Sequence, residues 1–233
     1  MPTINSFLPH DLWNRCTLAL FLVLWLVSCL RPPHPEYLLM QHGPTIVAVI
    51  ALVAVQNLLH VSKLSYTLIL MFLCIHLLGA RYLYSFVPYD DWLEPLLGVR
   101  ITEHFGFRRN HYDRLVHFLF GLLIVVPSWR FSRRIFGLGG WGSAAVAFSI
   151  IMAASAVYEI IEWGIAMTQS EMTAESYNGQ QGDVWDPHWD MTLAGIGSFL
   201  SLGLVGLTRY RRAPRRPKGP AVNSQGREPL DVM

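Results

Sequence analysis

Six long apolar runs constrain the fold of this 233-residue chain more than any other feature. A helix that crosses the hydrocarbon core of a bilayer needs about 20 mainly apolar residues. The runs cover residues 12–30, 44–59, 64–87, 112–129, 142–167 and 188–210, and the second is the shortest. They lack the alternation of barrel strands, and a helix satisfies its own backbone hydrogen bonds in lipid. The sequence therefore predicts an all-α, polytopic integral membrane protein, a bundle of about six transmembrane helices within residues 1–210.

The composition agrees with a membrane-embedded chain. Charged residues make up 15% of the sequence, whereas globular chains carry roughly 25%. The net charge of +2 comes from a short basic tail, so we expect the lipid bilayer as a partner and no nucleic acid. Cys16, Cys29 and Cys74 each lie inside an apolar run, which excludes a disulfide framework and a cysteine-based zinc site.

The distribution of basic residues predicts the orientation, because short loops rich in Lys and Arg remain on the cytoplasmic side. If both termini share one side, that side holds 12 of the 18 basic residues, seven of them in the last 25 residues. We therefore predict a multi-pass protein of the bacterial inner membrane with both termini in the cytoplasm. Residues 211–233 are predicted to form a disordered, polybasic cytoplasmic tail that lies near anionic lipid head groups.

The first apolar run has two interpretations. It ends in Leu26-Val27-Ser28-Cys29, which could be a lipoprotein signal that is cleaved before Cys29. An ordinary first helix is favoured, because Asp11 weakens the positive region of such a signal and two Trp residues are unusual within it.

Ionisable residues gather where the predicted helices reach the outer face. Three pairs are spaced so that both members project from one side of a helix: Asp113 with His117, Glu159 with Glu162, and Asp186 with Asp190. Ionisable groups at membrane depth are costly and usually face the bundle interior, where they mark a functional site. The same face carries further polar residues, namely His76, Arg81, Tyr84, Arg114, Asp183 and His188.

The residue types in this cluster indicate a divalent metal as the cofactor, since carboxylates and imidazoles from several helices are the ligands that bundle proteins use. The predicted metal ligands are His111, His117, Asp113, Glu162, Asp186 and Asp190. The predicted catalytic residues are Glu159, Glu162 and Asp113, with Glu159 as the base. The alternative is a structural network in which Arg81, Arg109 and Arg114 neutralise three of the acids.

Four motifs in order resemble the YjdF-like family of bacterial inner-membrane proteins, whose function is unknown. They are HLLGARYLY from His76, NHYDRLVHF from Asn110, YEIIEW from Tyr158 and QGDVWDPHWDM from Gln181. The resemblance spans residues 15–208 and implies an inner-membrane location and a multi-spanning fold, but no reaction. A looser resemblance to VanZ-like membrane proteins rests on the Asp113-Arg-Leu-Val-His117 helix, a later Glu-bearing helix and the helix that includes Asp190.

Three classes of function are compatible with this pattern. The first is a metal-dependent hydrolase or transferase that acts on a lipid-linked or envelope substrate; the others are a proton-coupled transporter and a non-catalytic scaffold. The lack of a Gly-x-Ser-x-Gly element argues against covalent acyl chemistry. Acids at one face rather than at the midplane argue against a transporter. Converging carboxylates in a pocket would favour metal chemistry, and a path to the other face would favour transport.

Overall fold

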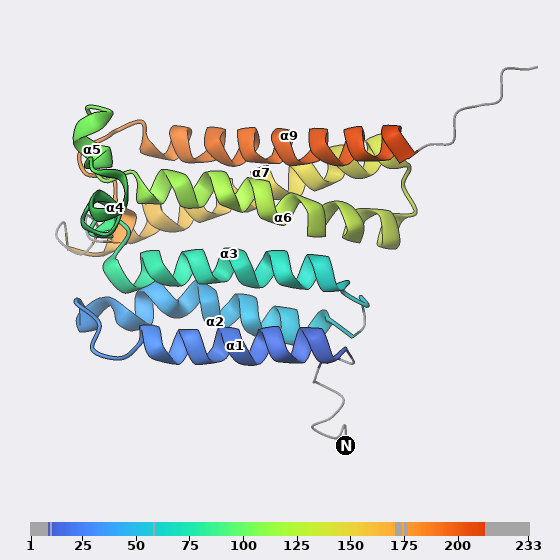
Figure 1. Cartoon of the computed structure of the whole chain (residues 1–233), viewed down its shortest axis with the longest axis horizontal. Helices are drawn as coiled ribbons and strands as arrows, with labels where there is room; N and C mark the ends of the chain where they lie inside the picture. Colours follow the sequence, from blue (N-terminus) through green and yellow to red (C-terminus); the bar gives the residue numbers. More distant parts are fainter. Residues whose placement is uncertain (1–8, 10, 58, 171–173, 175–176, 213–233) are drawn as a thin grey trace, which may run out of the picture.

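The computed structural model describes residues 9, 11–57, 59–170, 174 and 177–212, and of residues 209–212 the backbone alone. Six long helices run side by side in these residues, which contain no strand (Figure 1). The helices are α1 (Leu12–Ser28), α2 (Leu38–Val55), α3 (Lys63–Tyr82), α6 (Tyr112–Phe136), α7 (Gly140–Thr168) and α9 (Asp186–Arg212). The predicted all-α bundle is confirmed. Residues 213–233, most of the predicted tail, lie outside the described part.

Five helical segments are long and apolar enough to cross a membrane. They are Pro35–Val55, which joins the short 3-10 helix η2 (Pro35–Tyr37) to α2, and Lys63–Tyr82, Tyr112–Phe136, Gly140–Thr168 and Asp186–Thr208. The helix α1 is apolar but shorter, and its Phe21 packs with Leu70 and Leu73 of α3. Many large apolar side chains on the long helices are exposed, as suits a polytopic helical membrane protein surrounded by lipid.

Two helix ends differ from the sequence prediction for local reasons. The helix α3 ends at Tyr82 rather than at residue 87, because Leu83 and Tyr84 adopt left-handed φ angles of 54° and 52°. The helix α6 continues to Phe136 rather than ending at residue 129, and it stops where Gly137 has a φ of 62°. Pro44, predicted to begin the second helix, lies inside α2.

The segment between α3 and α6 contains two short helices, α4 (Tyr89–Leu97) and α5 (Ile101–His104), where the sequence suggested only a polar loop. The Arg100 guanidinium joins them by donating to Asp91 at 2.9 Å and to Glu94 at 3.0 Å. Both short helices cover the end of the bundle where α3 ends and α6 and α9 begin, which we call the site end (Figure 1). The start of α1 and the end of α9 lie at the opposite end, the far end (Figure 1).

Small residues bring α6 and α9 into close contact. A Cβ added to Gly121 of α6 would lie 1.9 Å from the carbonyl oxygen of Ala194, and one added to Gly197 of α9 would lie 2.2 Å from that of Phe118. Such a close approach of two backbones is typical of packing between membrane helices. Lipid provides no hydrophobic driving force for helix association, and small residues allow the van der Waals contacts that hold the helices together. This contact sets the first turns of α6 and α9 next to each other at the site end.

Candidate functional site

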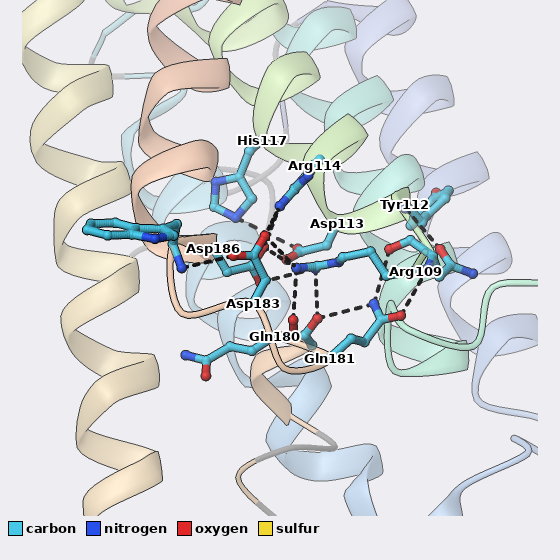
Figure 2. Close-up of polar contacts among 12 residues, drawn as sticks. Arg109, Tyr112, Asp113, Arg114, His117, Gln180, Gln181, Asp183 and Asp186 are labelled. Carbon is cyan, nitrogen blue, oxygen red and sulfur yellow. Dashed lines mark hydrogen bonds and ion pairs between the residues drawn. The ribbon is translucent and has the colours of Figure 1, made fainter. Parts of the chain in front are cut away.

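An arginine network joins the loop before α6 to the start of α9 (Figure 2). The buried Arg109 guanidinium holds both carboxylate oxygens of Asp186, at 2.5 and 3.1 Å, and also donates to the carbonyl oxygens of Gly179 and Gln180. Arg114 donates to Asp183 beside it. The pKa of Asp183 is lowered because its carboxylate accepts a hydrogen bond from the Trp185 backbone N–H and lies against Arg114.

Two amide side chains fasten the same loops. The Gln181 side chain accepts from the Asn110 backbone N–H at 2.9 Å and donates to the Asn110 carbonyl oxygen at 3.1 Å. The Asn110 side chain in turn donates to the Val87 carbonyl oxygen and accepts from the Tyr112 backbone N–H. Together with the arginine contacts, these hydrogen bonds join the loops at the site end, and both carboxylate oxygens of Asp186 are bonded.

A second group of ionisable side chains lies one turn deeper along α9. Asp113 and His117 of α6 and Asp190 of α9 are buried, and each offers a ligand atom within 4.8 Å of the other two. The Nε2 atom of His117 lies 3.8 Å from Asp113 Oδ1 and also 3.8 Å from Glu159 Oε1 of α7. We call Asp113, His117, Asp190 and Glu159 the carboxylate cluster.

Several oxygens of this cluster have no hydrogen-bond partner among the described residues. They are Asp113 Oδ2, Asp190 Oδ1 and both carboxylate oxygens of Glu159. A buried charge is costly unless it is paired. Because the arginines of the described network are already bonded to Asp183 and Asp186, the carboxylate cluster needs either protons, on its acids or on His117, or a bound cation.

The aromatic side chain of Tyr84 closes one wall of the site. Its hydroxyl contacts His76 Nδ1, while His76 Nε2 has no partner within the described chain. The left-handed turn at Leu83 and Tyr84 folds the ring back over Gly79, where an added Cβ would lie 2.6 Å from the ring. Burial, together with the nearby Asp113 carboxylate, raises the pKa of Tyr84.

A cavity of about 240 Å³ extends from the carboxylate cluster toward the middle of the bundle. Its polar end is formed by Asp113, His117, His76, Tyr84 and Tyr158. Its remaining wall is mostly apolar and includes Pro44, Ala48, Phe72, Leu73, Val116 and Phe120. The end of the cavity at the carboxylate cluster is therefore polar and ionisable, and the remaining wall suits an alkyl chain.

Nine predicted site residues lie outside the carboxylate cluster: Asp183, Asp186, Arg114, His76 and Tyr84, which form the contacts above, and Arg81, His188, His111 and Glu162. Arg81 donates to the carbonyl oxygens of Ser28 and Leu30, so it caps α1 rather than contacting an acid. His188 is exposed and packs edge-on against Trp185. The ring of His111 stacks on Phe107, and burial and the two nearby arginines lower the pKa of this histidine. Glu162 is buried on α7, one turn beyond Glu159.

Some residues that build the site were not among the predicted site residues. Tyr158 packs edge-on against His117 and lines the cavity, and the buried Asn178 donates to the Glu162 carbonyl oxygen at 3.1 Å. Arg109 was considered in the sequence only as one of three neutralising arginines. Tyr158 could have been predicted as a site residue from its helical spacing relative to Glu159 and Glu162. The contacts of Arg109 and Asn178, in contrast, depend on how the loops fold.

Residues 13–212 match the family model described as "Predicted membrane protein (DUF2238)". The chain belongs to this family. It is 33% identical over 190 residues to the "Inner membrane protein YjdF" of Escherichia coli (strain K12), a match that covers 80% of this chain and 86% of that protein. No solved structure matches the chain. The resemblance to YjdF-like membrane proteins is thus confirmed, and it assigns no activity.

Proposed function

We propose that the protein is a metal-dependent hydrolase or transferase that acts on a lipid-linked substrate at the membrane boundary. The observation that carries the proposal is the carboxylate cluster itself: buried oxygens without a partner among the described residues, beside a mostly apolar cavity that Asp113 and His117 line. One histidine nitrogen and two carboxylates suit zinc, manganese or iron. The ligand set that we propose is Asp113, His117 and Asp190.

The fit to a cation rests on charge and on separation. Asp113 and Asp190 bring two carboxylates together with a neutral imidazole, and their ligand atoms lie within 4.8 Å of one another. Side-chain rotation would close these atoms onto an ion that needs ligands at about 2.0–2.2 Å. When bound, such an ion lowers the pKa of a water molecule and polarises a phosphoryl or carbonyl oxygen.

The other side chains have roles that follow from their positions. Glu159, with both oxygens free of hydrogen bonds and Oε1 3.8 Å from His117, is placed to accept the proton of an attacking water or hydroxyl group. The Arg109–Asp186 pair holds the first turn of α9, and so the position of Asp190, in register with α6. Tyr84 and Tyr158 line the polar end of the cavity and would contact the substrate head group.

The apolar wall supports a lipid-linked substrate over a small soluble one. The cavity shares Ala48, Phe72, Leu73 and Phe120 with a larger groove toward the far end, so the wall that both spaces have in common is apolar. A proton or ion would meet no polar group at these four shared residues. This disfavours the transporter alternative.

The scaffold alternative is favoured by one observation only, the Arg109 and Arg114 ion pairs. These pairs account for Asp183 and Asp186, but leave the carboxylate cluster without compensation. A scaffold would have no need for unpartnered buried carboxylates, because replacing them with apolar residues of similar volume is often neutral or stabilising.

The test is metal content and metal affinity of the detergent-purified protein. We expect about one zinc, manganese or iron per chain, and loss of that ion in D113N, H117Q and D190N. The matched control is D91N, which neutralises an exposed acid of α4 outside the cluster. No bound metal in the wild-type protein, together with no calorimetric binding of Zn²⁺ or Mn²⁺, would refute the metal site.

A second measurement tests the substrate class. Wild-type and D190N proteins are reconstituted into vesicles made from total inner-membrane lipid extract, loaded with the bound metal, and the products are analysed by mass spectrometry. We expect water-soluble head-group products from the wild-type protein alone. Identical lipid profiles for both proteins would contradict turnover of a lipid-linked substrate, even if the metal is present.

A further inference from the structure

A large cavity lies at the far end, away from the carboxylate cluster. It has a volume of about 910 Å³, at the upper end of the roughly 300–1,000 Å³ typical of ligand sites. Residues of α2, α3 and α6 line it, and in its depth they are apolar, including Ala51, Leu52, Ile69 and Ile124. We call it the far-end groove.

Three arginines of α6 lie at the mouth of this groove. Arg130 donates to the Ser62 hydroxyl, Arg134 donates to His60 Nδ1 at 3.0 Å, and Arg133 stacks over the Trp129 ring at 5.1 Å. They are therefore held in place at the rim by neutral partners. The extension of α6 beyond residue 129, which the sequence did not predict, is what carries them there.

Among the described residues, no acid compensates the charge of these arginines. Within the described residues, no acidic side chain forms an ion pair with Arg130, Arg133 or Arg134, and no acid lines the groove. At the site end, by contrast, Arg109 and Arg114 are each bonded to a carboxylate. The far-end groove thus combines a cationic rim with an apolar interior.

The depth of the groove matches one leaflet of a bilayer. Its lining on α3 extends from Ser62 to Leu73, about 16 Å at the rise of an α-helix. A bilayer core is about 30 Å thick, so the groove reaches roughly to its middle. A lipid whose head group lies at the membrane surface would place its acyl chains along this length.

We propose that the far-end groove binds an anionic phospholipid. The phosphate is held by Arg130, Arg133 and Arg134, and an acyl chain fills the interior between α2, α3 and α6. The inference does not depend on the proposed metal chemistry, because none of the carboxylate cluster lines this groove. With the cytoplasmic termini that the basic residues predict, the bound lipid belongs to the cytoplasmic leaflet, which is rich in anionic lipids.

The test uses delipidated full-length protein in a non-ionic detergent, titrated with dioleoyl-phosphatidylglycerol or dioleoyl-phosphatidylcholine and followed by native mass spectrometry. We expect at least tenfold tighter binding of the anionic lipid. The R130Q/R133Q/R134Q variant should lose this preference and retain the weak binding of phosphatidylcholine. A matched triple variant, R31Q/R100Q/R108Q, removes three arginines outside the groove and should behave as the wild type.

A second variant tests the groove apart from its charge. Ala51→Trp places a large side chain in the far-end groove without touching the smaller cavity, and should weaken binding of both lipids. Equal affinity of the wild-type protein for the two lipids would overturn the proposal. So would anionic-lipid binding that survives the R130Q/R133Q/R134Q change, or a lipid-free dimer that this change dissociates, since a second copy would then occupy the groove.

Discussion

Two buried aspartates, one turn apart on α9, are predicted to differ in how much stability the same substitution removes. Asp186 is 2% exposed and bonded through both oxygens to Arg109, whereas Asp190 is 1% exposed and its Oδ1 has no partner. In D186N the Arg109 guanidinium keeps its bonds to Gly179 and Gln180 but loses the carboxylate bonded to it, and the nearest remaining acid is Asp183 at 3.8 Å. In D190N an amide replaces the Asp190 carboxyl group, whose Oδ1 has no partner among the described residues.

The magnitudes follow from the cost of an unpaired buried charge. Removing one partner of a buried ion pair costs about 3–5 kcal/mol, and the remaining amide hydrogen bond places D186N near the lower end, about 3 kcal/mol. That corresponds to roughly a hundredfold change in the unfolding equilibrium constant. For D190N in metal-free protein, we expect a stability within about 1 kcal/mol of the wild type, because the amide replaces a carboxyl oxygen that has no bonded partner to lose.

The assay is unfolding in mixed micelles of rising denaturing-detergent content, followed by tryptophan fluorescence with a chelator present. Repetition with metal at a hundred times its dissociation constant should stabilise the wild type by about 2.7 kcal/mol and leave D190N unchanged. If D190N is as unstable as D186N in the chelator, the two aspartates do not differ in the way argued. If D186N loses the metal and D190N retains it, the ligand assignment is wrong.

Three other perturbations test the packing and the electrostatics. G121A and G197A should each destabilise the protein by about 1–3 kcal/mol, because the new Cβ would overlap backbone atoms of the facing helix. The control G203A, whose Cβ would have no neighbour within 4 Å, should be neutral or slightly stabilising. Thermal unfolding measures the stability of all three variants. G79A should displace the Tyr84 ring from His76, and Y84F should remove only the hydroxyl, so a larger change in the affinity of the cavity for an alkyl probe, measured by calorimetry, is expected for G79A. D183N should be less stable than the wild type at pH 7, since the folded-state pKa of Asp183 is lowered; this stabilisation is fully present above the usual value of 3.8 and is lost as pH falls through the folded value, so the two melting curves should converge in acid.

Each of these results has a contradicting outcome. Equal destabilisation by G203A and G121A would mean that helix propensity alone, and not the α6–α9 contact, controls stability. A Y84F effect as large as that of G79A would assign the cavity wall to the hydroxyl rather than to the ring. A constant difference between D183N and wild type from pH 7 into acid would show that the charge of Asp183 is not what Arg114 stabilises.

The sequence alone predicted the six long helices and the end of the bundle at which the acids gather. Apolar runs near membrane-spanning length admit few folds, and helix alternation brings Asp113, Glu159 and Asp190 to one end whatever the absolute orientation. The spacing of Asp113 and His117 also correctly placed both on one side of α6, where they lie 3.8 Å apart. These properties are local, since they depend on the period of a helix and on its length.

Which acids are paired and which are not was decided only by the tertiary structure. Asp186 and Asp190 are equivalent in sequence, but the loop before α6 delivers Arg109 to the first and nothing to the second. Arg81 likewise caps α1 instead of pairing with an acid, and the last turns of α6 place three arginines at the rim of the far-end groove. An ion pair requires two side chains within about 4 Å, and that separation comes from how loops and helices pack, which spacing along one helix cannot encode.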